Sequence, residues 1–229
     1  MPAAESLCPG CKEKSSSFSR LKESELLQAD KNKVQIRYRK GETIVKQGSF
    51  GNNILYVREG LVKVYKELED DSDLIYGILP CGSLLGLSNL YSNNIFKYTA
   101  AAMTDSNICS VDKNIIERFI RDNGDFAMSI IELLNQETSM LRDKMVSLTH
   151  KHMKGRLSDT LIHLSKEIFN STTFPYKLSR NDLAEFSGMS MMSVVRTMQE
   201  FLKSGYVREK DGKIEILEMD ALESISKGD

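Results

Sequence analysis

Residues 177–202 read KLSRNDLAEFSGMSMMSVVRTMQEFL, and this stretch decides how the chain is interpreted. It predicts a short helix, a tight turn at Gly188 and a second helix, because glycine tolerates the positive φ that such a turn requires. Apolar residues at helical spacing predict the inner faces of the two helices. They are Leu183, Ala184, Phe186, Val194, Met198, Phe201 and Leu202.

The outer face of the second helix carries candidate DNA contacts, since a helix presented in this way can enter a major groove. Arg196 is the strongest candidate for a base contact, because guanidinium to guanine is the commonest specific pairing. Ser179 and Arg180 begin the first helix and are candidates for phosphate contacts, because a helix N-terminus attracts anions. The remaining candidates on the second helix are Ser190, Met191, Met192, Ser193 and Thr197.

The residues that follow strengthen this interpretation. Asp211-Gly212 stands between two alternating runs and predicts a β-hairpin. A helix-turn-helix followed by a hairpin is a winged helix, a fold whose usual work is DNA binding. Lys213 on the hairpin is a candidate for a phosphate contact, although it is equally compatible with a solvated strand charge. For residues 177–202 alone, an ordinary helical hairpin inside a core remains the alternative.

Charge and composition limit the remaining options. The 229 residues include 31 Lys and Arg against 32 Asp and Glu, so any DNA affinity must come from a local basic patch and depend strongly on salt. No apolar run approaches the roughly 20 residues of a membrane span. The first residues lack the basic and apolar regions of a signal peptide. A cytoplasmic protein without a membrane partner is expected.

Two segments with other residue patterns precede the winged helix. Between about residues 34 and 111, short β-rich runs alternate with Gly, Asn and Asp turns, which predicts a β-barrel or jelly roll. Residues 125–150 predict one long helix with a coiled-coil seam and hence a homodimer, although packing of the seam on the chain's own barrel is the alternative. The seam residues proposed for the dimer interface are Ile131, Leu134, Thr138, Leu141, Met145 and Leu148.

The expected fold class is therefore α+β, with four parts. Residues 1–24 form an N-terminal segment that contains cysteines, and residues 25–124 form the barrel sensor domain. Residues 125–150 form the dimerisation helix and hinge, and residues 151–229 form the winged helix-turn-helix domain.

This order of parts resembles the Crp/Fnr family, named after the cyclic-AMP receptor and the fumarate-nitrate reduction regulator. Gly155-Arg156-Leu157 at the start of the helix after the hinge, and Leu55-Tyr-Val-Arg-Glu-Gly60 in the barrel, are similar to motifs of that family. The resemblance implies a homodimeric transcription regulator that binds a near-palindromic operator, with RNA polymerase as a further partner. It also implies that a signal in the barrel repositions the recognition helices through the long helix.

The chain departs from the family where cyclic-nucleotide members bind phosphate. Gly86 is followed by Leu87 where those members have Glu, and Phe96-Lys97 stand where they have Arg-Ser. Burying a phosphate without a charge partner is costly, and a lysine does not replace the bidentate fork of an arginine. An effector pocket at Gly86, Leu87, Phe96 and Lys97 is therefore not expected to bind cyclic AMP tightly. Met192 also replaces the Glu of the family's recognition helix, so a different operator is expected.

The cysteines point to another kind of sensor. Cys8-Pro-Gly-Cys11 has a spacing that suits a metal, an iron–sulfur cluster or a reversible disulfide. Cys109 lies in the strand that carries a distant ligand in Fnr-type relatives, but those relatives have a third N-terminal cysteine that this chain lacks. Cys81 is a candidate replacement. The alternative is that Cys109 is a small buried hydrophobe and Cys81 an incidental loop thiol.

Other functions are weaker interpretations. Haem ranks below thiol chemistry, because all three histidines lie in or after the hinge. A small-molecule or haem-binding barrel without specific DNA activity stays open as the alternative function. An enzyme is not expected, since the barrel shows no His/Glu metal set, nucleophile elbow or glycine-rich phosphate loop.

Overall fold

The computed structural model describes residues 15–69, 73–175 and 178–228. The chain divides into two compact units, Met1–Val64 with Leu79–Ser139, and Tyr65–Ile78 with Met140–Asp229. Among the described residues, no helix is long and apolar enough to cross a membrane.

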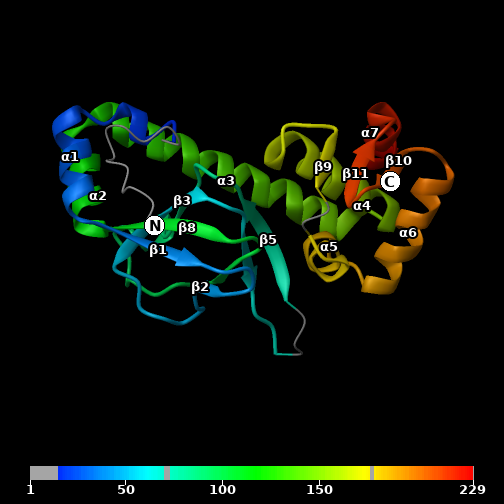
Figure 1. Cartoon of the computed structure of the whole chain (residues 1–229), viewed down its shortest axis with the longest axis horizontal. Helices are drawn as coiled ribbons and strands as arrows, with labels where there is room; N and C mark the ends of the chain where they lie inside the picture. The colour runs from blue at the N-terminus through cyan, green and yellow to red at the C-terminus, as the bar shows by residue number, and fades with distance from the viewer. Residues whose placement is uncertain (1–14, 70–72, 176–177, 229) are drawn as a thin grey trace. The chain divides into compact units, whose positions relative to one another are not determined.

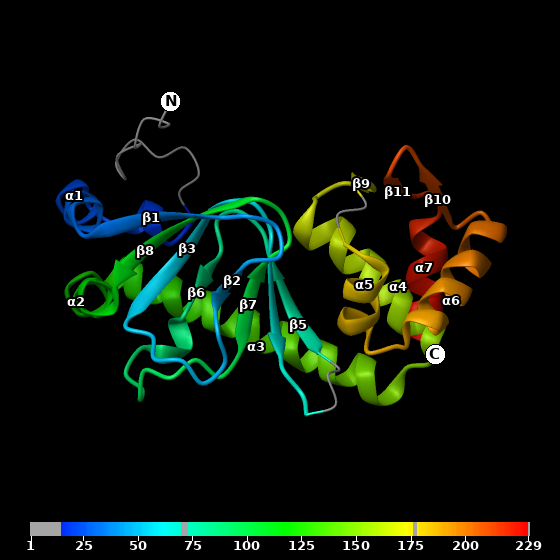
Figure 2. The ribbon, with the colours of Figure 1, turned by 60° about the horizontal axis from the view of Figure 1, so that its bottom comes forward.

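The N-terminal part is built on two antiparallel sheets, as Figures 1 and 2 show. One has the strand order β1-β8-β3-β6 and the other β2-β7-β4-β5. Glycines with positive φ stand at the turns, which is why Gly41, Gly60 and Gly82 separate the β-rich runs. The strands are β1 (Lys33–Tyr38), β2 (Thr43–Val45), β3 (Asn53–Glu59), β4 (Val62–Lys66), β5 (Leu74–Leu79), β6 (Leu84–Leu85), β7 (Thr99–Ala102) and β8 (Ser106–Asp112).

Helices close one side of this barrel. They are the 3₁₀ turn Phe18–Arg20, α1 (Glu23–Lys31), α2 (Lys113–Asp122) and the first turns of α3 (Gly124–His150). Asp112 caps α2 by accepting a hydrogen bond from the backbone N–H of Asn114 at 2.8 Å. A single buried cluster joins these helices to the sheet, and Phe18, Ile54, Leu87, Phe119 and Phe126 are members of it.

The second unit contains the winged helix. After the final turns of α3 come α4 (Met153–His163), a π-helical turn (Leu164–Ile168) and β9 (Thr173–Pro175). The helix-turn-helix and wing follow as α5 (Arg180–Ser187), α6 (Met191–Lys203), β10 (Val207–Lys210) and β11 (Lys213–Ile216), and α7 (Met219–Gly228) ends the described chain. The small sheet has the order β10-β11-β9.

The α+β class, the β-barrel, the long helix and the winged helix expected from the sequence are confirmed. Three elements of the second unit were not expected. β9 adds a third strand to the wing sheet, Leu164–Ile168 leaves the α-helical register, and α7 packs on α4.

Candidate nucleic-acid interface

The helix-turn-helix has well-defined ends. Ser179 caps α5, because its Oγ accepts from the backbone N–H of Asp182 at 3.0 Å while its own N–H donates to Asp182 Oδ2 at 2.9 Å. Gly188 ends α5 with a φ of +64°, a conformation that favours glycine. Ser190 caps α6 by accepting from the backbone N–H of Ser193 at 3.2 Å. The short local sequence therefore fixes where both helices begin.

The two faces of α6 differ sharply. Met192 is 77% exposed and Met191 51% exposed, and Arg196 is exposed on the same helix. These side chains are free of the core, so they are available to a groove. The inner face is buried and consists of Val194, Thr197, Met198 and Phe201.

Thr197 corrects the set of candidate contacts. It is 3% exposed, because it lies one turn before Phe201 and one turn after Val194 on the face that packs inward. The expectation that Thr197 lies on the outer face is wrong, and its side chain is not available to a base.

Two cations and a leucine hold the turn between α5 and α6. Lys144 Nζ lies 3.6 Å from the centre of the Phe186 ring and donates to the carbonyl oxygen of Phe186. Arg156 Nη1 donates to the carbonyl oxygen of Gly188 at 3.1 Å. A Cβ added at Gly188 would lie 2.3 Å from Leu148 Cδ2. The last turns of α3 and the start of α4 are therefore packed directly on the turn.

Burial changes the protonation of this cluster. It lowers the pKa of Lys144 to about 8. His163 has its ring 5.4 Å from that of Phe186, and burial, followed by the charge of Lys144, lowers its pKa to about 4. At neutral pH the imidazole of His163 is therefore neutral, while the side chain of Lys144 is an ammonium group. No sequence pattern marks Lys144 or His163 for this role, since contacts between distant helices decide it.

The wing is a regular two-residue hairpin. Asp211 has a φ of +51° and Gly212 of +69°, as a type I′ turn requires. Arg208 on β10 donates from Nε to Glu215 on β11 at 2.9 Å. Lys213 is exposed at the hairpin end, where a cation can meet a DNA backbone.

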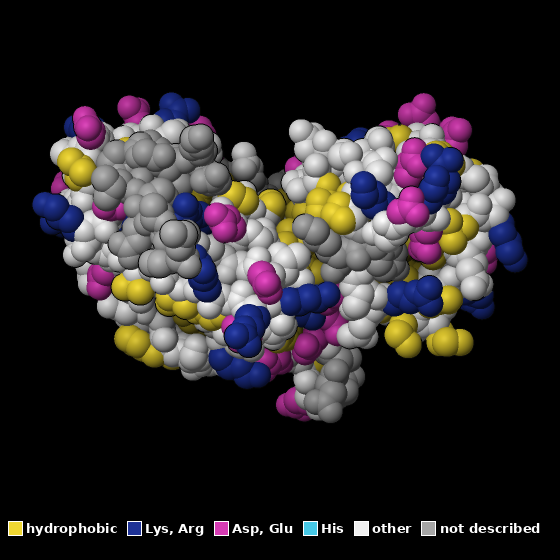
Figure 3. All heavy atoms as spheres, viewed as in Figure 1, with side chains coloured by type: hydrophobic (Ala, Val, Ile, Leu, Met, Phe, Trp, Pro, Cys, Tyr) yellow, Lys and Arg dark blue, Asp and Glu magenta, His cyan; other side chains and the backbone are white. Residues whose placement is uncertain are grey.

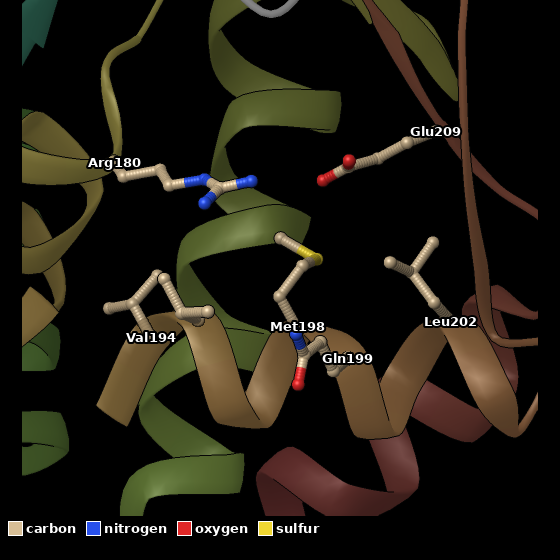
Figure 4. A pocket seen from close by; sticks show the side chains of 7 residues that line it. Arg180, Val194, Met198, Gln199, Leu202 and Glu209 are labelled. Atoms are coloured by element: carbon tan, nitrogen blue, oxygen red, sulfur yellow. The ribbon is translucent and has the colours of Figure 1, made fainter. Parts of the chain in front are cut away.

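A small hollow lies between α5, α6 and the wing. Figure 4 shows Arg180 and Glu209 pointing toward each other above the side chain of Met198. Val194 and Leu202 add apolar surface to its lining. Arg180 and Glu209 also line a second, more open hollow with Lys213 at the hairpin tip. Arg180 and Lys213, two of the candidate phosphate contacts, therefore line hollows that also contain the carboxylate of Glu209.

The side of the molecule drawn in Figure 3 has no broad basic face among the described residues. In Figure 3, Lys and Arg side chains are interspersed with Asp and Glu over the face shown. This pattern agrees with the formal net charge of −1. With a net charge close to zero, contacts with DNA are expected to come from a few local cations.

The candidate effector pocket in the barrel is filled by the chain itself. Phe96 is 4% exposed, and a Cβ added at Gly51 would lie 2.0 Å from its ring. The N–H of Gly86 donates to Tyr98 Oη at 2.9 Å, and burial raises the pKa of Tyr98 to about 12. Phosphate approaching Gly86 would have to displace this neutral hydroxyl.

The other two pocket candidates do not favour a cyclic nucleotide either. Leu87 belongs to the buried core cluster of the barrel and its helices, so it offers neither charge nor hydrogen bond. Lys97 is exposed. The four residues are a poor fit for a cyclic nucleotide, because the single cation among them, Lys97, is exposed and none supplies a buried charge partner for phosphate.

Two of the four cysteine candidates lie among the described residues, and their surroundings differ. Cys8 and Cys11 lie outside the described residues. Cys81 is exposed and its Sγ donates to the carbonyl oxygen of Arg58 at 2.9 Å, whereas Cys109 is buried in β8. Within residues 15–69, 73–175 and 178–228, no three His, Cys, Asp or Glu side chains gather as a metal site. A cluster involving Cys81 and Cys109 remains a prediction.

The predicted dimer seam follows an exposed side of α3. Met145 is 67% exposed and Ile131 50%, and Thr138 is also exposed. Leu134 and Leu141 are exposed by 37% and 42%. Leu148 differs, because it is partly buried against the turn at Gly188 of its own chain.

Comparison with known proteins agrees with this architecture. A cyclic nucleotide-binding domain model matches residues 35–123, and a Crp-like helix-turn-helix domain model matches residues 155–225. The chain belongs to the Crp/Fnr family of transcription regulators, which bind DNA and are not enzymes. The alternative of a barrel protein without DNA activity is therefore set aside.

Individual relatives are distant. The nitrogen fixation regulation protein FixK of Bradyrhizobium diazoefficiens is 25% identical over 224 residues, which cover 96% of this chain and 93% of that protein. The fumarate and nitrate reduction regulatory protein of Salmonella typhimurium is 24% identical and covers 82% and 76% respectively. The structure of FixK2 from Bradyrhizobium japonicum has the same fold, with a TM-score of 0.77 and 20% identity over 84% of this chain and 96% of that one.

Proposed function

We propose that this regulator binds a near-palindromic operator as a homodimer, with α6 in the major groove of each half-site. The observation that carries this proposal is the two-faced character of α6. Arg196 and the two methionines are exposed at its outer side, while the inner side is fully packed. Phosphate contacts from Ser179, Arg180 and Lys213 would fix the register of the helix on DNA.

Within the groove, each exposed side chain has a role that its chemistry suits. Arg196 would read guanine through two hydrogen bonds. Met191 and Met192 would pack on thymine methyl groups, and Ser190 and Ser193 would donate to a base edge or a phosphate. A DNA-bound regulator acts in the compartment of the genome, so we infer a cytoplasmic location. Contact with RNA polymerase remains a prediction from the family resemblance.

The first experiment selects an operator from random duplexes and measures affinity by fluorescence anisotropy. Arg196→Ala should weaken operator binding by about 1–3 kcal/mol, since one bidentate contact is worth that much. Gln199→Ala, an exposed change three residues further along α6, is the matched control. Unchanged operator affinity in Arg196→Ala would refute the base-reading role.

The homodimer is proposed through α3. The exposed apolar stripe of this helix has a coiled-coil spacing, and burying it against a second copy would remove that surface from water. Met145→Glu places like charges in the seam of both copies and should yield a monomer. Gln136→Glu adds the same charge at an exposed position off the seam and should leave a dimer. Light scattering after size exclusion distinguishes the two, and a dimeric Met145→Glu protein would contradict the seam.

The signal is proposed to be something other than a cyclic nucleotide. The Phe96 ring beside Gly51 and the Tyr98 hydroxyl on Gly86 support this. Calorimetry with cyclic AMP should show no saturable binding. Micromolar binding that disappears in Lys97→Ala would overturn the proposal.

Thiol chemistry is the proposed alternative input, because Cys8 and Cys11 have the spacing of a metal or redox pair. The test is an absorption spectrum of protein purified without oxygen. A broad sulfur-to-iron band that bleaches in air would support a cluster held by Cys8, Cys11 and Cys109, whereas a sharp Soret band would indicate haem. A spectrum with neither leaves reversible thiol oxidation, tested by mass spectrometry of the two cysteines.

A further inference from the structure

Arg180 and Glu209 face each other across the hollow above α6. In Figure 4 the guanidinium and the carboxylate point toward one another, one from the start of α5 and the other from β10. Among the described residues, Arg180 and Glu209 do not form a salt bridge, so the two charges face each other across the hollow without direct contact. Both side chains also border the open hollow at the hairpin tip.

This geometry creates a conflict with DNA. A phosphate that binds Arg180 from the mouth of the hollow must approach the carboxylate of Glu209, and like charges repel. Met198 and Leu202 line the floor of the hollow with apolar groups, while Arg180 and Glu209 are exposed to solvent, so the charge effects have the modest size typical of surface pairs. Binding of a phosphate at Arg180 therefore brings two negative groups toward the same guanidinium.

We propose that Glu209 is a positioning residue that faces Arg180 across the hollow and disfavours DNA phosphate at Arg180 through the like charges of carboxylate and phosphate. This inference rests on the proposed function, since it takes Arg180 as a phosphate contact. Phosphate contacts carry no sequence information, so this repulsion weakens binding of operator and unrelated DNA by the same factor. Glu209 thus lowers the affinity for all DNA. Stable binding then depends on the base contacts that α6 makes.

The wing supplies a matched control. Glu215 is also a carboxylate of the hairpin, on the neighbouring strand β11, but it accepts a hydrogen bond from Arg208 at 2.9 Å. Removing Glu215 changes the charge of the wing by the same amount as removing Glu209. It leaves Arg180 unchanged but frees Arg208, so the control is made in the Arg208→Ala background, where it separates a local effect on Arg180 from a general change of charge.

The test is a double-mutant cycle on the full chain. Wild type, Arg180→Ala, Glu209→Gln and the double variant are titrated with a labelled mixed-sequence duplex at low ionic strength, where phosphate contacts dominate binding. Glu209→Gln should tighten binding by about two- to five-fold, as expected for one exposed charge pair. In the Arg180→Ala background the same change should have almost no effect. Glu209→Asp should keep most of the wild-type weakening.

The possible results distinguish the proposed role of Glu209 from a general charge effect and from the proposed function. Tightening that persists in Arg180→Ala, or that Glu215→Gln reproduces in the Arg208→Ala background, would mean a long-range charge effect and would overturn the proposal. No tightening in Glu209→Gln would also overturn it. If wild type does not bind any duplex at low salt, the proposed function falls with it. If wild type binds and the cycle shows no coupling, only the role of Glu209 falls.

Discussion

Acidification should destabilise the DNA-binding unit through His163. The imidazole packs near Phe186 and beside Lys144, and its pKa is lowered to about 4 by burial and by that ammonium. In the unfolded chain the same group titrates near its ordinary value of about 6.5. Between these two values the unfolded chain binds more protons than the folded one, so stability falls as the pH falls.

The magnitude follows from the two pKa values. A difference of about 2.5 units corresponds to about 3 kcal/mol once the pH lies below both. Most of the loss occurs between pH 6.5 and pH 4, and the share between pH 7 and pH 5 is about 2 kcal/mol. His163→Phe keeps an aromatic ring beside Phe186 but cannot gain a proton, so it should lack this part of the acid sensitivity.

Urea unfolding at fixed protein concentration, followed by circular dichroism at pH 7 and pH 5, measures the effect. Hydrogen exchange of peptides from α4 and α6 places it in the second unit. His152→Asn removes an exposed histidine of the same unit and should keep the wild-type profile. Carboxylates also titrate near pH 5, so the informative quantity is the difference between wild type and His163→Phe. Equal losses in the two proteins would refute the argument.

Three other changes test single contacts. Phe96→Ala should destabilise the barrel by about 3–5 kcal/mol in thermal or urea unfolding, as emptied aromatic sites do, and a loss below about 1 kcal/mol would contradict its tight packing. Gly188→Ala should lose about 1–2 kcal/mol, because alanine is strained at a φ of +64°. Adding Leu148→Ala should make the double variant less destabilised than the sum of the two, and simple additivity in unfolding would count against the contact. Between pH 8 and pH 10 the free energy of unfolding of the wild type should rise, because the pKa of Lys144 is about 8 in the folded protein and higher in the unfolded chain. Lys144→Met should gain less over this range. The same pH dependence of melting in both proteins would exclude a buried ammonium.

The sequence was informative where the signal is local. Gly188, Ser190 and Asp211-Gly212 determine backbone geometry through their own conformational preferences, so the helix-turn-helix and the wing could be predicted from single residues. The barrel followed from alternation between turn residues and β-rich runs. The predicted caps and turns need no information about distant parts of the chain.

Prediction failed where distant elements decide the outcome. Thr197 was expected on the outer face of α6. Helical spacing alone did not define how wide the buried stripe is, because packing against α4 and the turn determines that width. Leu148 also packs on Gly188, a contact that its seam spacing did not indicate, and its place in a dimer seam stays a prediction. α7 was missed because its short amphipathic pattern has meaning only against α4.

The contacts around Gly188 constrain how the long helix can act on the DNA reader. Lys144 and Leu148 belong to α3, yet both contact the turn that joins α5 to α6. Ser147 Oγ adds a third link by donating to Asp159 Oδ2 on α4 at 2.6 Å. These contacts tie the last turns of α3 to the helix-turn-helix, so a rotation of those turns must move α6 with them.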